Sequence, residues 1–184
     1  MAQDGETLTG TLAGNYKITI ADGATVTLDG VTINGESVDD DAYKHAGITC
    51  EGDATIILSG TNSVKGFYED YPGIFVPENK TLTIKGDGSL TASSNGFGAG
   101  IGGGYEIACG NITIEGGTIT ATGGVYAAGI GGGEEASCGD ITITDGVTSV
   151  TATAGEDANS LGAGDGGTCG TISITAASGK VVQN

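Results

Sequence analysis

Residues 98–124 read GAGIGGGYEIACGNITIEGGTITATGG, and the pattern returns at 127–155 as AAGIGGGEEASCGDITITDGVTSVTATAG and at 162–175 as GAGDGGTCGTISIT. Each copy joins short strands, in which apolar and polar residues alternate, through glycine-rich turns. Repeats of roughly thirty residues with this content are typical of solenoids, where each repeat packs only on its neighbours. We align Gly100 with Gly129 and Gly164, which places Asp165 where Ile101 and Ile130 stand in the earlier copies.

More divergent copies precede these three, so a strand with the pattern apolar-polar-apolar recurs along the chain. Its six occurrences lie at 26–28, 56–58, 82–84, 112–114, 141–143 and 172–174. A second strand carries one apolar residue per repeat, and these residues are Ile33, Val64, Leu90, Ile119 and Val150. A third strand carries an isoleucine after glycine, at Ile48, Ile74, Ile101 and Ile130.

Three short strands per repeat with a hydrophobic interior predict an all-β protein, a single-stranded parallel β-helix of about six turns. Connections between parallel strands are almost always right-handed, so we expect the right-handed form. Period-two alternation places the isoleucines inside and stacks the polar residues on the outer face about 4.8 Å apart. That outer ladder, which Ile57 interrupts, consists of Thr27, Thr83, Thr113, Thr142 and Ser173.

One elongated domain accounts for residues 1–184, with irregular insertions at 35–47 and 65–73. The net charge is −17, with six lysines and no arginine. This balance argues against nucleic acid and against an anionic membrane surface, because both need clustered cations. No apolar run is long enough to cross a bilayer, so we expect no membrane insertion.

The first residues, Met1 to Asp4, lead into polar sequence without the apolar segment of a secretory signal. Taken literally, this indicates a cytoplasmic protein. We expect instead that a leader is absent from this segment and that the protein lies outside the cell or on a bacterial surface.

Three of the four cysteines, Cys109, Cys138 and Cys169, precede a glycine at one repeat position. Stacking places their Cα atoms about one turn apart, a separation that a disulfide can accommodate. Three thiols in a column cannot all pair, so we expect a reduced thiol ladder at a corner of the solenoid. One ligand type in a straight line does not build a tetrahedral metal site.

The two insertions lie one turn apart and are expected to meet in space. They contain much of the chain's aromatic content beside a group of carboxylates. Aromatic rings stack on sugar faces, and carboxylates accept hydrogen bonds from hydroxyls. The alternative is that the rings only cover the first turns as a cap. The candidate ligand-binding residues, one of which lies in a later turn, are Tyr43, Phe67, Tyr68, Asp70, Tyr71 and Tyr105.

Acidic residues gather at two places that could hold calcium, since Ca²⁺ prefers carboxylate and carbonyl oxygens. The first is Asp39-Asp40-Asp41 in the insertion, and the second is the turn carrying Glu106 in one repeat and Glu134-Glu135 in the next. Neither run matches a known calcium loop, so Ca²⁺ is a candidate cofactor on charge density alone. A soluble acidic surface without bound metal is the alternative.

Catalysis is not expected. Polysaccharide-cleaving β-helices generally use an arginine, lysine or histidine beside carboxylates to handle a proton. This chain has no arginine, and His45 is its only histidine. The GIGGG runs lack the lysine and the helix that a phosphate-binding loop needs.

The recurring ITIEGGTITATGG and AAGIGGG segments resemble the parallel β-helix carbohydrate-binding domains of surface proteins from anaerobic and gut bacteria. The resemblance covers residues 25–175. It implies a pectate-lyase-like fold without catalysis and a polysaccharide ligand, such as a plant cell-wall or acidic glycan. No sugar-binding residue of that family carries over by motif.

Three functions follow from these observations. The leading one is a non-catalytic carbohydrate-binding module, with calcium as a possible aid to binding. The second is a structural or adhesive stalk that binds a protein partner. The third uses the outer threonines, because flat regular threonine arrays can order water and bind ice; the interruption at Ile57 argues against it.

Overall fold

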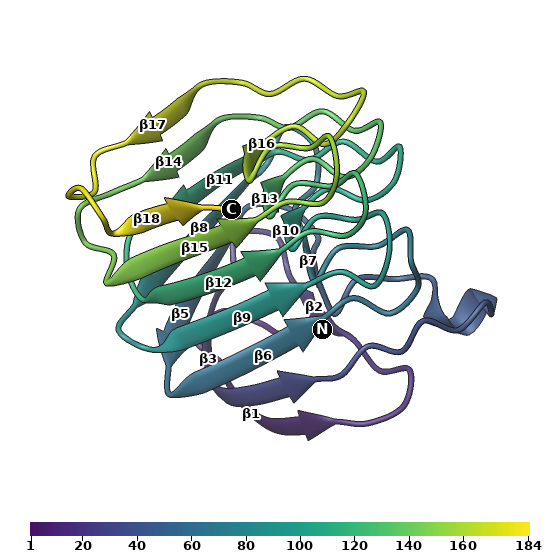
Figure 1. Cartoon of the computed structure of the whole chain (residues 1–184). Helices are drawn as coiled ribbons and strands as arrows, with labels where there is room; N and C mark the ends of the chain where they lie inside the picture. Colours follow the sequence, from purple (N-terminus) through teal and green to yellow (C-terminus); the bar gives the residue numbers. More distant parts are fainter.

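Stacked parallel strands make up almost the whole molecule in a computed structural model that describes residues 1–184 (Figure 1). The larger of two sheets has twelve strands, listed here in chain order. They are β1 (Thr7–Leu12), β3 (Thr25–Ile33), β5 (Ala54–Ser59), β6 (Thr61–Lys65), β8 (Thr81–Gly86), β9 (Ser89–Ser93), β11 (Asn111–Ile114), β12 (Thr118–Thr122), β14 (Ile141–Ile143), β15 (Ser149–Thr153), β17 (Ile172–Ile174) and β18 (Val181–Gln183).

The smaller sheet has six short strands in the order β16-β13-β10-β7-β4-β2. Their bounds are β2 (Ile18–Ile20), β4 (Ile48–Cys50), β7 (Ile74–Phe75), β10 (Ile101–Gly102), β13 (Ile130–Gly131) and β16 (Leu161–Gly162). Every pair of neighbouring strands is parallel, and each turn contributes three strands. The chain is therefore a parallel β-solenoid of about six turns, the predicted right-handed parallel β-helix.

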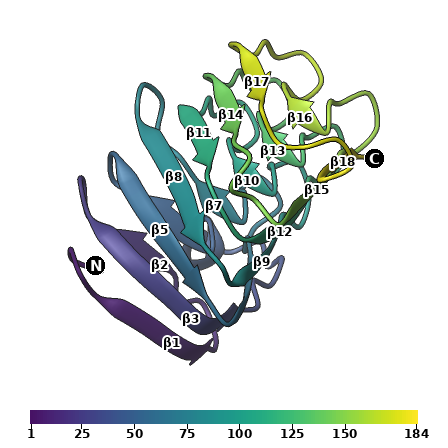
Figure 2. The same cartoon turned by 90° about the vertical axis from the view of Figure 1, so that its left-hand side faces the viewer.

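Two of the three faces of the solenoid can be followed in the figures. Figure 1 shows β6, β9, β12 and β15 stacked along one face. Figure 2 shows β3, β5, β8, β11, β14 and β17 stacked along the next. The only helix is a 3-10 turn, η1 (Asp41–Tyr43), which projects from the side of the molecule (Figure 1). The chain contains no helix with the length and apolarity that a bilayer crossing requires.

Alternation fills the interior as the sequence predicts. In β11 and β14 the isoleucines are fully buried, while Thr113 and Thr142 between them face outward. One cluster of 34 buried residues runs through the molecule. Small residues occupy its narrow side, where the stacked column is Ala92, Ala121 and Ala152.

The predicted register is wrong by two residues between β5 and β8. Ile56 lies opposite Ile84 rather than Leu82, and Thr55 lies opposite Thr83. A slip of two residues keeps every side chain on its own face, so alternation could not detect it. The outer ladder is consequently uninterrupted, and its members are Thr25, Thr55, Thr83, Thr113, Thr142 and Ser173.

The second apolar column also differs from its prediction. Leu90 lies opposite Asn62, not Val64, and Val64 lies opposite Ala92. Asn62 is 1% exposed and fully bonded: its Oδ1 accepts from Val31 N at 2.9 Å, and its Nδ2 donates to two backbone carbonyls. A buried polar side chain is tolerated here because it satisfies the backbone where the chain turns between β5 and β6.

The sequence alignment of the last turn with the earlier repeats is wrong. Leu161, not Asp165, stacks on Ile130 and is 3% exposed. Asp165 lies exposed in the short loop that follows β16. Gly131 and Gly162 are paired there with positive φ values of 136° and 129°. A Cβ at Gly131 would collide with the Gly162 carbonyl, and glycine follows the inward residue in β10, β13 and β16.

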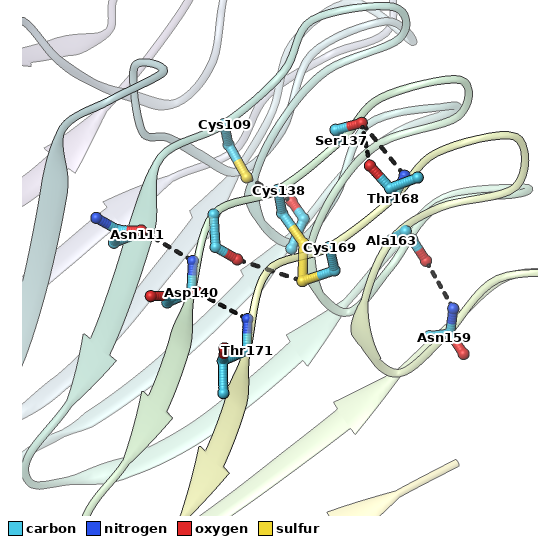
Figure 3. The surroundings of a disulfide bond; sticks show 12 residues. Cys109, Asn111, Ser137, Cys138, Asp140, Asn159, Ala163, Thr168, Cys169 and Thr171 are labelled. Carbon is cyan, nitrogen blue, oxygen red and sulfur yellow. Dashed lines mark hydrogen bonds between the residues drawn. A yellow bond between two sulfur atoms is a disulfide. The ribbon is translucent and has the colours of Figure 1, made fainter.

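The cysteine prediction is partly wrong. The structure joins Cys138 and Cys169 in a disulfide between neighbouring turns, with a Cα separation of 4.6 Å (Figure 3). Cys109 is buried as a free thiol at the same corner, and its Sγ donates to Gly131 O. Two turns in register bring a pair of cysteines within disulfide range, and the third has no thiol left to join.

Both ends of the solenoid leave strands paired on one side only. At the carboxyl end, β17 pairs only with β14 and β18 only with β15. Ile172 and Ile174 point inward by register but remain 43% and 39% exposed, because no further turn covers them.

Candidate functional site

The two insertions meet, as predicted. The backbone N–H groups of Phe67 and Tyr68 donate to the carbonyls of His45 and Tyr43 at 3.2 and 3.1 Å. Asn95, from the next turn, donates through Nδ2 to carbonyls of both insertions, at Gly35, Gly66 and Phe67. This asparagine fixes one loop against the other, a role that no pattern in the sequence indicated.

Phe67 does not face solvent, so its prediction as a sugar-stacking residue is wrong. Its side chain is 1% exposed and belongs to the core cluster. The ring packs against His45 with a centroid separation of 4.4 Å and against Tyr43 at 6.2 Å. An apolar residue in a loop that covers a core is buried by the hydrophobic effect unless something holds it out. Tyr43 is half-buried against the same cluster.

A groove lies beside these loops, on the outer face of the small sheet. We call it the β4–β7 groove; its volume is about 300 Å³. Its lining residues are Lys17, Lys44, His45, Ala46, Thr49, Tyr71, Phe75 and Ile107. Phe75 and Thr49 are adjacent outward positions of β7 and β4, while Tyr71 comes from the second insertion. The rings of Tyr71 and Phe75 are both partly exposed.

The β4–β7 groove carries positive charge on an acidic molecule. It contains Lys17 and Lys44, two of only six lysines in a chain of net charge −17. Asp41 accepts from Lys44 Nζ at 2.9 Å, which raises the pKa of Lys44 and keeps the ammonium charged. Both ring nitrogens of His45 lie near backbone carbonyls, Nδ1 at 3.0 Å from Ala46 O and Nε2 at 3.1 Å from Asn15 O.

Tyr68 and Asp70 flank this region without lining the groove. The Lys44 Nζ lies 5.5 Å from the centre of the Tyr68 ring. Partial burial raises the pKa of Asp70, and the Glu69 charge raises it further. The pKa of Tyr68 is raised by partial burial and then by the Asp39 charge.

Tyr105 and the second acidic group form one stacked corner. The Glu106 N–H donates to Glu134 O at 2.9 Å, and the Glu135 N–H donates to Asp165 O at 2.7 Å. Tyr105 packs against Phe97 at 6.0 Å between ring centres, and the Glu106 charge is the main cause of its raised pKa. Partial burial and then the Glu135 charge raise the pKa of Glu134.

The carboxylates of the two acidic groups do not converge. No set of three or more histidine, cysteine, aspartate or glutamate side chains is placed to hold a metal ion. In the first group, Asp40 Oδ1 accepts from Ala42 N at 2.9 Å to cap η1, and Asp41 pairs with Lys44. Asp39 is exposed beside them. These side chains stabilise the loop, and they do not form the ligand shell that Ca²⁺ requires.

Comparison with known proteins supports the fold alone. A family described as a beta helix repeat matches residues 82–105 and 112–134. Each matched segment is one turn of the solenoid, from β8 to β10 and from β11 to β13. No curated protein and no solved structure matches the chain.

Sequence reasoning missed most of the groove. Phe75 could have been found, because alternation in Ile74-Phe75-Val76 turns its ring outward at the position that threonine occupies in β2 and β4. Lys17 and Ile107 gave no comparable signal. They reach the groove from segments far apart in the chain, and only the winding of the solenoid brings them together.

Proposed function

We propose that this chain is a non-catalytic glycan-binding module of an extracellular or bacterial cell-surface protein, and that the sugar occupies the β4–β7 groove. The observation that carries this proposal is the pair of partly exposed rings, Tyr71 and Phe75, in a groove with two lysines. Sugar faces stack on such rings while the hydroxyl and acid groups reach polar side chains.

The charge of the groove favours an acidic glycan. Lys17 and Lys44 can each donate to a uronic acid carboxylate, and charge-assisted hydrogen bonds are among the stronger polar contacts. The rest of the molecule is acidic and repels such a polymer, so the lysines select where it binds. Calcium is left out of the proposed binding step, because the acidic side chains do not converge.

The absence of catalysis is part of the proposal. The His45 ring is held by carbonyls on both sides and so is poorly placed to accept a proton from a ligand. No other histidine and no arginine is present in the chain.

A glycan array of the purified domain tests this function, run once with calcium and once with chelator. We expect binding to uronic-acid oligosaccharides in both arms. Phe75→Thr removes the ring and introduces the residue found at the paired position of β4, Thr49. This change should weaken binding about tenfold. Tyr68→Ala, in the insertion that precedes β7 but outside the groove, serves as the control. A blank array in both arms would instead favour a stalk that binds a protein partner.

The uninterrupted threonine ladder favours a second candidate, an ice-binding surface. Six hydroxyl-bearing residues form one column, and the adjacent face adds the column Thr32, Ser63, Thr91, Thr120 and Thr151. Outward threonine is also what any β-face prefers. Inhibition of ice recrystallisation would support this function if Thr113→Tyr abolished it and Phe75→Thr did not.

A further inference from the structure

Cysteine side chains occupy one column on three successive turns of the solenoid, and only two of them are joined. Cys138 is bonded to Cys169, which lies on the last turn. Cys109 lies one turn before Cys138 and is a buried free thiol. Figure 3 shows Cys109 beside the disulfide, with its sulfur directed toward the neighbouring turn. Cys138 is therefore the middle member of the column.

The backbone relates Cys138 to its two neighbours in the same way. Each pair of turns is joined by one hydrogen bond donated by the earlier cysteine and one accepted by it. These bonds are Cys138 N to Thr168 O (2.8 Å), Gly170 N to Cys138 O (3.0 Å), Cys109 N to Ser137 O (3.0 Å) and Gly139 N to Cys109 O (3.1 Å). A spacing that suits a disulfide between Cys138 and Cys169 thus also suits one between Cys109 and Cys138.

A cleft opens on this corner. Its volume is about 180 Å³, and both Cys109 and Cys138 line it together with Ser137 and Asn111. The cleft therefore borders both cysteine residues, although each of them is buried. Exchange would require the Cys109 side chain to turn from Gly131 O toward Cys138.

The last turn has little else to hold it. It stacks on one neighbour only, and the side chains of β17 remain exposed. The bond from Cys138 to Cys169 is the only covalent cross-link between this turn and the one below it, apart from the backbone itself. Moving that bond would change how firmly the end of the solenoid is attached.

We infer that the disulfide is exchangeable within the column, so that Cys109 can displace Cys169 from Cys138. The Cys109 thiolate attacks Sγ of Cys138, a new bond forms between them, and the bond to Cys169 breaks. Cys169 leaves as a thiolate and takes up a proton, so one thiol and one disulfide remain and nothing is oxidised or reduced. The disulfide moves one turn inward, and the last turn gains a free, partly exposed thiol at Cys169.

Burial makes this exchange slow. It raises the pKa of Cys109 to about 12, so the reactive thiolate is scarce in the closed fold. Exchange is therefore expected over hours, and the test must allow for this.

The direct test uses the folded oxidised chain with N-ethylmaleimide present throughout, followed by digestion without reduction. Cleavage after glutamate places the three cysteines in separate peptides, 107–115, 136–156 and 157–184. We expect slow alkylation of Cys169 and, in the same molecules, a linked pair of the first two peptides. Cys109→Ser is the matched control and should leave Cys169 bonded and unlabelled. Alkylation of Cys109 alone, or equal labelling of Cys169 in the control, would overturn the inference.

A second variant tests the alternative pairing without relying on the rate. In Cys169→Ser, mild oxidation with oxidised glutathione should link Cys109 to Cys138, as read from the same peptides. If Cys138 instead carries only glutathione while circular dichroism shows a native fold, the two neighbours of Cys138 are not equivalent and exchange is excluded.

Discussion

Phe67 illustrates how a single side chain can organise the loops of this solenoid. It is the largest fully buried side chain of the insertions, and it lies between the core and the rings of Tyr43 and His45. Its contacts hold the loops that form one wall of the β4–β7 groove. The adjacent aromatic residue, Tyr68, remains partly exposed.

Phe67→Ala should therefore lower the free energy of unfolding by about 3–5 kcal/mol, through loss of burial and creation of a cavity. Tyr68→Ala, at the adjacent position, should change it by less than about 1 kcal/mol. Urea denaturation followed by circular dichroism measures both. Equal effects of the two changes would show that Phe67 is not the anchor of the loops.

At the level of elements, the stacking of strands depends on side chains that satisfy the backbone at corners. Asn62 occupies a column that is otherwise apolar, since Leu90 and Ile119 follow it on the next turns. Asp22 and Asp53 act similarly at another corner, where Asp22 Oδ1 accepts from Asp53 N and Asp53 Oδ1 accepts from Thr81 N, both at 2.8 Å.

Asn62→Leu should destabilise the fold by about 2 kcal/mol or more, although it places in the column the residue found one turn later. The leucine leaves Val31 N and the Ser59 and Ser89 carbonyls without their partner. Leu90→Met, a change of shape without loss of a hydrogen bond, is the control and should cost less than about 1.5 kcal/mol. A thermal melt in which Asn62→Leu matches or exceeds the wild type would contradict this role.

The same elements show what the sequence could and could not predict. Alternation correctly assigned inward and outward residues and the three strands of each turn, because parity is a local property. It could not fix the register of β8 on β5, because a slip of two residues preserves parity. Leu161 was missed because several glycines close together allow more than one alignment of the last repeat with the earlier ones.

The candidate site was harder to predict than the fold. The meeting of the two insertions followed from their spacing, but burial of Phe67 depended on the space left over the core. Lys17 and Phe75 belong to different turns, so their proximity is a property of the winding. A reduced thiol ladder was expected because three cysteines cannot all pair, yet two of the three do.

Taken as a whole, the molecule is a short rod with a strongly acidic surface and uncovered ends. Stacking in register brings like charges together on successive turns, as where Asp165 lies one turn beyond Glu134 and helps to raise its pKa, after partial burial and the neighbouring Glu135. Repulsion of this kind is part of the free energy of folding, and it can be changed with pH or salt.

The stability of the rod should rise as the pH falls from neutral toward about 5, near the upper edge of the carboxyl range. The pKa values of Asp70 and Glu134 are raised in the folded state, so the folded chain binds protons more tightly than the unfolded chain. Their stabilising contribution is complete below the unfolded pKa and is lost as pH rises through the folded pKa. Melting temperatures across this range test it, and high salt should reduce the difference. A melting temperature that falls steadily as the pH is lowered over this range would contradict the prediction.

The location of the glycan is tested most directly by nuclear magnetic resonance of the ¹⁵N-labelled chain during titration with a uronic-acid oligosaccharide. If the β4–β7 groove is the binding site, shift changes should centre on Thr49, Tyr71, Phe75 and Ile107, and Phe75→Thr should weaken them. Shift changes centred on β6, β9, β12 and β15, or no changes at all, would show that the groove does not bind the glycan.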